Sequence, residues 1–279
     1  MPKVRLRDIV KTLVRSRSLP FTRDIVRQKP SNSLGRIRWQ DRDIYYRPGT
    51  TDPLVVQQVL LKGGRKAEYY LPPTFRPDVI LDIGSNIGAS ILYFHHVYPN
   101  ARIIGFEPHP DTFAVLQKNV SDLPQVKVLN CGLGSTNTQI TLPGESVNFG
   151  AFSTKGRARG PRRTGAETEG QGTVECEVRR LDDVLRDLGI QRIDLIKIDC
   201  EGAEADVITG LSLEILEQCQ WIVGELHDAS AFTVLARLST YFDLDLKKQM
   251  FSPLFRFHAC NLSSARTLRD GLDIDALQR

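Results

Sequence analysis

Short apolar runs alternate with helical patterns through the middle of this chain. The apolar runs that resemble strands lie at 79–83, 101–106, 126–130, 194–198 and 221–225. Stretches with apolar residues at helical spacing separate them, at 87–97, 111–120, 181–188 and 203–211. Strands that alternate with helices in this way pair in parallel, and the helices cover both faces of the sheet. The pattern therefore predicts an α/β fold.

The rhythm differs on either side of this core. Residues 36–46 alternate as a short hairpin does, and a helix is predicted over 53–61 with Asp52 as its N-cap. After Gly132, two further strands, at 139–142 and 173–178, flank a Gly-rich basic loop over 155–172. We expect that loop to be mobile, either as a lid or binding element or as disorder without function. A helix over 231–241 and strands at 242–248 and 254–259 complete the pattern.

The turn after the first core strand has the composition of a cofactor site. A dinucleotide turn requires G-x-G-x-x-G, but here Asn86 and Ala89 stand where two of the glycines would be needed. Asp82 precedes the turn and would repel a phosphate, whereas it would attract the positive charge of S-adenosylmethionine. Glu107 follows Gly88 by 19 residues and ends the next strand, where a carboxylate binds ribose hydroxyls. The alternative is that the glycines serve only tight packing.

Several sequence blocks carry a resemblance to a known family. They are YYRPGTTDPLVVQQVL (45–60), VILDIGSNIGAS (79–90), GFEPHP (105–110), LNCGLGS (129–135), LIKIDCEGAE (195–204) and VGELH (223–227). Together they resemble the FkbM-type methyltransferases, a branch of the class I, Rossmann-like enzymes that use S-adenosylmethionine. Ser85 stands where the family usually has Ala. The resemblance implies a seven-stranded, mostly parallel sheet with an antiparallel last strand and helices on both faces.

Two groups of residues are candidates for the chemistry. The donor-binding candidates are Asp82, Gly84, Asn86, Gly88, Glu107, Pro108 and Asn130. The catalytic candidates follow later strands: Asp199 is the first candidate for the group nearest the acceptor, His227 is the rival base, and Lys197 pairs with a carboxylate or steers the acceptor. Asp199, Glu201 and Glu225 are an alternative oxygen-rich site for Mg²⁺. Glu204 is interpreted as an acid in the first turn of a helix.

These residues predict an S-adenosylmethionine-dependent O-methyltransferase. The resemblance implies a hydroxyl of a carbohydrate or of a glycosylated or secondary metabolite as the acceptor. The alternatives are N-methylation, a donor-binding partner protein without activity and, more remotely, a nicotinamide oxidoreductase.

Charge and cysteine content place bounds on location and partners. The net charge is +4, but residues 1–38 carry eleven Lys or Arg against two Asp. An amphipathic helix in this arm either packs on the domain or lies on an anionic membrane surface. No aromatic and basic platform for nucleic acid accompanies the charge. Five scattered cysteines and the lack of an apolar leader predict a cytoplasmic protein, with peripheral membrane contact as an option.

The pattern also predicts how the chain is divided. The expected parts are a basic helical arm (1–35), a hairpin and helix (36–76), the donor-binding methyltransferase domain (77–262) and a C-terminal tail (263–279).

Overall fold

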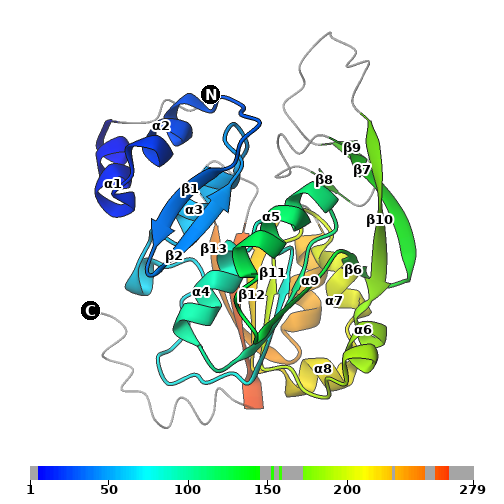
Figure 1. Cartoon of the computed structure of the whole chain (residues 1–279). Helices are drawn as coiled ribbons and strands as arrows, with labels where there is room; N and C mark the ends of the chain where they lie inside the picture. Colours follow the sequence, from blue (N-terminus) through cyan, green and yellow to red (C-terminus); the bar gives the residue numbers. More distant parts are fainter. Residues whose placement is uncertain are drawn as a thin grey trace.

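A seven-stranded sheet forms the centre of the protein, seen in Figure 1. The computed structural model describes residues 6–144, 152–153, 157–158, 172–227, 230–248 and 255–263. The strands are β3 (Val79–Ile83), β4 (Arg102–Phe106), β5 (Val126–Leu129), β11 (Leu195–Ile198), β12 (Trp221–Leu226), β13 (Phe242–Lys248) and β14 (Phe255–Asn261). Their order is β13-β14-β12-β11-β3-β4-β5, and β14 runs antiparallel to both of its neighbours. The predicted fold class and the antiparallel last strand are confirmed.

Helices cover both faces of this sheet because successive strand residues point to opposite sides. Ile80 and Ile103 pack on one face, and Leu81 and Ile104 on the other. The first face carries α4 (Ala89–Val97) and α5 (Pro110–Val120). The second face carries α6 (Leu181–Leu188), α7 (Glu204–Gly210), α8 (Leu213–Gln218) and α9 (Ala231–Leu238). The core strands and most of these helices agree with prediction to within a few residues, but α8 was not foreseen.

The N-terminal elements pack on the first face, beside α4 and α5 (Figure 1). They are α1 (Leu6–Ser16), α2 (Leu19–Arg27), β1 (Gly35–Trp39), β2 (Arg42–Tyr46), α3 (Asp52–Val59) and the 3₁₀ turn η1 (Gly64–Lys66). Asn119 of α5 joins them to the sheet layer. Its side chain accepts a hydrogen bond from the Tyr45 amide at 2.8 Å and donates to the carbonyls of Tyr45 and Ile87.

The predicted hairpin is confirmed, but the predicted cap of α3 is wrong. The N-cap residue is Thr51, and Asp52 is the first residue of the helix. The Asp52 carboxylate instead accepts hydrogen bonds from the backbone and side chain of Arg47, at 2.8–2.9 Å. An acid beside a turn can serve the loop before it as readily as the helix after it.

The apolar stripe of α1 is only partly covered. Ile9 and Leu13 are half-buried, whereas Val10 and Val14 are 53% and 68% exposed. Thr12, not an apolar residue, is the buried centre of the helix face. Among the described residues, no helix is long and apolar enough to cross a membrane.

A second, three-stranded sheet extends from the first. It comprises β6 (Gly132–Gly134), β10 (Thr173–Arg180) and β7 (Thr138–Pro143), and β7 and β10 pair antiparallel. Between them lies the pair β8 (Phe152–Ser153) and β9 (Arg157–Ala158). The rest of the predicted loop, up to residue 171, and the C-terminal tail from residue 264 lie outside the described residues.

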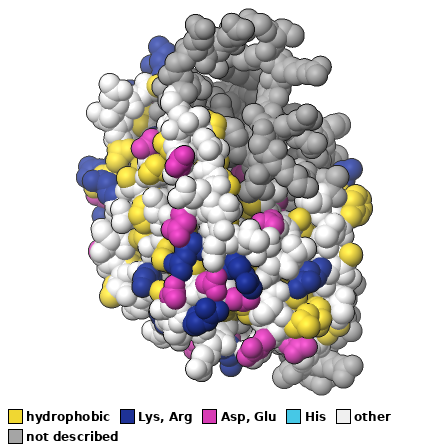
Figure 2. Space-filling model, turned by 90° about the vertical axis from the view of Figure 1, so that its right-hand side faces the viewer, with side chains coloured by type: hydrophobic (Ala, Val, Ile, Leu, Met, Phe, Trp, Pro, Cys, Tyr) yellow, Lys and Arg dark blue, Asp and Glu magenta, His cyan; other side chains and the backbone are white. Residues whose placement is uncertain are grey.

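The face that carries β10 and α6 mixes charges of both signs (Figure 2). Arg179 pairs with Asp187, and Arg186 pairs with Asp183. Such exposed, balanced pairs are typical of a solvated surface. The candidate chemistry lies elsewhere, at the carboxyl ends of the central strands.

Candidate active site

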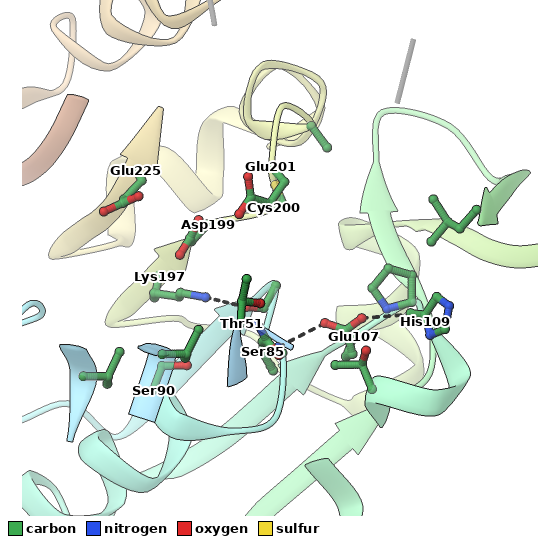
Figure 3. Close-up of a pocket in the computed structure, with 18 of the residues that line it drawn as sticks. Thr51, Ser85, Ser90, Glu107, His109, Lys197, Asp199, Cys200, Glu201 and Glu225 are labelled. Atoms are coloured by element: carbon green, nitrogen blue, oxygen red, sulfur yellow. Dashed lines mark hydrogen bonds between the residues drawn. The ribbon is translucent and has the colours of Figure 1, made fainter. Parts of the chain in front are cut away.

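A cavity of about 800 Å³ opens at the carboxyl ends of β3, β4, β11 and β12. Volumes of roughly 300–1,000 Å³ are usual for small-molecule sites. Figure 3 shows two groups of side chains around it. Glu107 and His109 lie at one end, and Asp199, Glu201 and Glu225 lie at the other. The cavity is therefore placed where open parallel sheets bind their ligands.

The turn after β3 forms the floor between these ends. Gly84, Asn86 and Gly88 all have positive φ, at 76°, 48° and 90°. Glycine adopts this region freely, and Asn tolerates it better than most residues. A Cβ at Gly84 would collide with the carbonyl oxygen of Asp199, so the close approach of the two strand ends requires glycine here. The turn thus serves both packing and the cavity.

Glu107 is held in place by backbone amides. Its two carboxylate oxygens accept hydrogen bonds from the amides of Asn86 and His109, each at 3.0 Å. Burial raises the pKa of Glu107 to about 7, and these hydrogen bonds oppose the rise. Each oxygen retains a lone pair for a further donor. The geometry suits a pair of ribose hydroxyls.

Of the remaining donor-binding candidates, some line the cavity and others do not. Gly84, Asn86 and Pro108 line the cavity. Gly88 and Asn130 are not among the described residues that line it. Gly88 packs against α5, and the Asn130 amide donates to the carbonyls of Glu107 and Pro108. Asn130 thereby braces the strand end that carries Glu107.

Asp82 lies beneath the cavity, fully buried, and its expected exposure to the donor is not found. The Lys197 ammonium lies 3.0 Å from its carboxylate, and Ser90 donates to it at 2.6 Å. Asp82 and Lys197 are direct neighbours across β3 and β11, on the same sheet face. Lys197 also donates to the carbonyls of Ile83 and Gly84. Lys197 therefore pairs with a carboxylate as expected, but with one that was assigned to the donor.

Asp199 lies at the opposite end of the cavity from Glu107 (Figure 3). The Tyr69 hydroxyl donates to its carboxylate at 3.4 Å, and burial holds the pKa of Tyr69 well above its usual value. The Asp199 side chain is a quarter exposed, so that a ligand can contact it. Glu201, two residues on, has a positive φ of 55° and also lines the cavity.

His227 lies behind these carboxylates. It is not among the described residues that line the cavity. Its Nδ1 lies 2.9 Å from Glu204, and its Nε2 lies 3.2 Å from Glu201 and 3.6 Å from Asp199. Burial opposes its charge, but the hydrogen bond to Glu204 and the neighbouring carboxylates raise the pKa of His227 to about 9. The imidazole thus holds a proton at neutral pH, which favours a positioning role over that of a base.

Glu204 has a larger structural role than that of an acid in the first turn of a helix. It is buried, and it accepts hydrogen bonds from the amides of Cys200 and Gly202 as well as facing His227. An acid in the first turn of a helix is a common feature, but complete burial of this one marks a structural link between two strand ends.

The cluster that could hold a metal ion differs from the expected one in a single residue. Asp199 and Glu201 have ligand atoms within 4.8 Å of each other and of His227. Glu225 lies outside this group, and Arg256 donates to it at 2.6 Å. Burial and the nearby carboxylates raise the pKa of Glu201, while His227 opposes the rise.

The cavity wall contains two residues that the sequence pattern does not predict for the site. Glu68 and Tyr69 line it beside Leu54, Val55 and Val59 of α3. Arg256 bridges Glu68 at 3.0 Å to Glu225, from a strand almost 190 residues later in the chain. The segment around Glu68 has no strand or helix periodicity, so only the three-dimensional fold brings it to the site.

The cavity fits an S-adenosylmethionine molecule at its Glu107 end. Asn86 lines the cavity, and its Oδ1 is buried without a hydrogen-bond partner among the described residues. That oxygen and the lone pairs of Glu107 can accept hydrogen bonds from the hydroxyl and amino groups of a bound nucleoside.

Comparisons with known proteins agree with this geometry. The model of the methyltransferase FkbM domain matches residues 82–251. Methyltransferase sdnD of Sordaria araneosa is 37% identical over 54% of this chain and 67% of its own length. The 2-O-methyltransferase NoeI of Sinorhizobium fredii is 31% identical over 61% of this chain and 72% of its own length.

Among solved structures, fibrillarin of Aeropyrum pernix with bound S-adenosyl-L-methionine has a TM-score of 0.45 and 13% identity, over 83% of this chain and 84% of that one. The family match covers more than half of the chain and both ends of the cavity. The chain belongs to the FkbM methyltransferase family and is an S-adenosylmethionine-dependent methyltransferase.

Proposed function

We propose that this enzyme methylates a hydroxyl group of a carbohydrate or of a glycosylated or secondary metabolite. The observation that carries the proposal is the position of Asp199 at the far end of the cavity from the ribose-binding Glu107. This arrangement leaves room for an acceptor beside the donor methyl. The names of two relatives, NoeI and the hexuronic acid methyltransferase AglP of Haloferax volcanii, point to sugar acceptors for those proteins.

The chain's own residues supply position and proton transfer. Bound S-adenosylmethionine supplies an activated methyl group. Glu107 and Asn86 hold the nucleoside, and α3 and Tyr69 line one side of the cavity. Asp199 orients the acceptor hydroxyl and accepts its proton as the new carbon–oxygen bond forms. The Tyr69 hydroxyl and protonated His227 keep the Asp199 carboxylate in place.

Two measurements test this proposal. Calorimetric titration is expected to show binding of S-adenosylhomocysteine but not of NAD. Asp199→Asn is expected to lower kcat by about 100-fold or more, with S-adenosylhomocysteine affinity unchanged. Glu201→Gln is the matched control, and a larger loss there would assign proton transfer to Glu201. An amine acceptor needs the base less, so a loss under about tenfold in Asp199→Asn would favour N-methylation.

Magnesium dependence is the alternative mechanism, and the donor set supports it less. Mg²⁺ prefers oxygen ligands, whereas the grouped residues here include the His227 imidazole. The raised pKa of His227 means that metal binding would have to displace a proton. Activity that persists in excess chelator supports the metal-free mechanism, and loss that Mg²⁺ restores would overturn it.

We further propose that α1 contacts an anionic membrane surface. Val10 and Val14 are exposed on this helix, and Lys11 and Arg15 beside them are exposed too. Apolar and basic side chains on one helix are the combination that binds at a lipid interface.

A further inference from the structure

The walls of the cavity differ in charge and in hydrogen-bonding capacity from one end to the other. At the end away from Glu107, the side chains of Glu68, Asp199, Glu201 and Glu225 line it. Lys197 is the cationic side chain among the described lining residues there. Its ammonium is occupied by Asp82 and by two backbone carbonyls.

The cationic side chains behind this wall are fewer than the carboxylates of the same network. The carboxylates within the network are Asp82, Glu68, Asp199, Glu201, Glu204 and Glu225, and the cationic groups are Lys62, Lys197, His227 and Arg256. The six carboxylates outnumber the four cations by two when all are ionised, and by one when Glu201, whose pKa burial raises to about 8, is protonated. Burial also raises the pKa of Glu68 and lowers that of Lys62. Arg256 and His227 lie behind the wall, each against two or more of its carboxylates.

Ionised carboxylates accept hydrogen bonds and cannot donate them. A hydroxyl or an ammonium group can donate to such a wall, whereas a carboxylate or phosphate offers only acceptors and negative charge. Like charges in a partly buried site repel each other, so an anionic acceptor binds less tightly there. The opposite side, formed by Leu54, Val55 and Val59, is apolar and suits the carbon face of a sugar ring or of a lipophilic metabolite.

We infer that the acceptor is uncharged or cationic, presents hydroxyl or ammonium donors to Glu68, Asp199 and Glu225, and carries no carboxylate or phosphate near the methylated atom. The inference rests on the proposed function and narrows it. It separates this enzyme from a relative such as AglP, whose name specifies a hexuronic acid.

The charge of the cavity can be measured without knowing the acceptor. Thr51 lines the cavity at the start of α3, and Thr51→Cys places a thiol there. The two partly exposed native thiols are first removed by Cys200→Ser and Cys260→Ser. The rate of modification is then compared for a cationic and an anionic methanethiosulfonate reagent, the ethyltrimethylammonium and ethylsulfonate forms. Ser121→Cys is the reference at an exposed position, where Arg42 pairs with Asp122 and Lys118 lies nearby, and free cysteine in solution is the second, uncharged reference for the same two reagents.

The cation-to-anion rate ratio is expected to be about tenfold or more higher at Thr51→Cys than at Ser121→Cys. Adding Glu68→Gln should lower that ratio, because it removes one wall charge. Equal ratios at the two positions, or a lower one in the cavity, would overturn the inference. So would faster methylation of methyl glucuronide than of methyl glucoside or methyl glucosaminide.

The thiol experiment can refute the charge inference without contradicting the proposed function. S-Adenosylhomocysteine binding together with equal rate ratios at the two positions would refute the charge inference and leave the proposed hydroxyl methylation, which Asp199→Asn tests, intact. A high ratio without S-adenosylhomocysteine binding would do the reverse.

Discussion

The buried ion pair of Asp82 and Lys197 is the residue-scale feature on which the two halves of the site depend. Both side chains are almost fully buried, and their strands are the two central ones of the sheet. We expect Lys197→Met to destabilise the protein by about 3–5 kcal/mol, because it leaves the Asp82 carboxylate buried without its cation. Urea unfolding in the absence of donor measures the change.

The exposed pair of Arg179 and Asp187 provides the control for this prediction. Both side chains are partly or largely exposed, so Arg179→Met should cost less than about 1 kcal/mol. The double variant Lys197→Met with Asp82→Asn should be more stable than Lys197→Met alone. If both single variants lose the same stability, the buried pair has no special role.

Glu107 gives donor binding a pH dependence. Burial raises its pKa from the ordinary value of 4.5 to about 7 in the folded protein. We propose that the ionised form is the one that accepts hydrogen bonds from the two ribose hydroxyls. Binding therefore strengthens as pH rises through 7 and weakens as pH falls. Between pH 8 and pH 6 the S-adenosylhomocysteine affinity should fall by about tenfold, the change in the ionised fraction of a group with that pKa.

Calorimetry at several pH values tests this expectation. Glu107→Gln keeps the shape but cannot ionise, so its affinity should be lower and nearly independent of pH over the same range. Unchanged affinity in Glu107→Ala would refute the ribose assignment itself.

The sequence predicts the site residues that directly follow strand ends, but not those that distant segments of the chain contribute. Glu107 and Asp199 line the cavity where the spacing placed them. The partner of Asp82 was not foreseen, because a cross-strand register between β3 and β11 joins residues 115 positions apart. Glu68 and Arg256 were missed because only the three-dimensional fold brings them together, and Glu68 lies in no helix or strand.

At the scale of elements, periodicity identified the core strands because their apolar runs are bounded by glycine, proline and acids. It did not identify α8, whose six residues are too few for a helical pattern to emerge. It also assigned Asp52 as the N-cap of α3, although Asp52 is the first residue of that helix and its carboxylate holds Arg47 in the loop before. Short elements and local side-chain bonds depend on packing that the sequence pattern does not contain.

Helix α1 is the element whose exposure allows a direct test of membrane contact. The protein is expected to sediment with vesicles of phosphatidylcholine and phosphatidylserine, and much less with phosphatidylcholine alone. Val10→Asp with Val14→Asp should weaken this binding, since these side chains are exposed in the structure.

The matched control carries Thr209→Asp with Thr233→Asp, two exposed changes on α7 and α9 that add the same charge away from α1. Equal sedimentation of the two variants, or binding unaffected by the lipid charge, would contradict the proposed contact. Raising the salt concentration should reduce the binding of the unaltered protein, because basic side chains contribute to it.

At the scale of the whole molecule, the N-terminal hairpin and α3 share a hydrophobic core with the first face of the sheet. Ile37, Ile44 and Val56 are buried in the same cluster as Ile80 and Phe94. The α3 side of the cavity is therefore part of the same packed body as the donor side, and we propose that residues 36–76 do not unfold separately.

The two tryptophans of the chain make this proposal testable. Trp39 lies in β1 and donates to the Leu60 carbonyl, and Trp221 lies in β12 of the central sheet. Trp39→Phe and Trp221→Phe each leave one fluorescent reporter, in a different part of the molecule. If the body unfolds as one, both reporters follow the same transition as circular dichroism of the same variant, with one midpoint in urea. Asn119→Ala should lower both midpoints together, since Asn119 of α5 joins the hairpin to the turn after β3. An earlier transition of the Trp39 signal would show instead that residues 36–76, which form the α3 side of the cavity, unfold before the central sheet. S-Adenosylhomocysteine would then stabilise only the later transition.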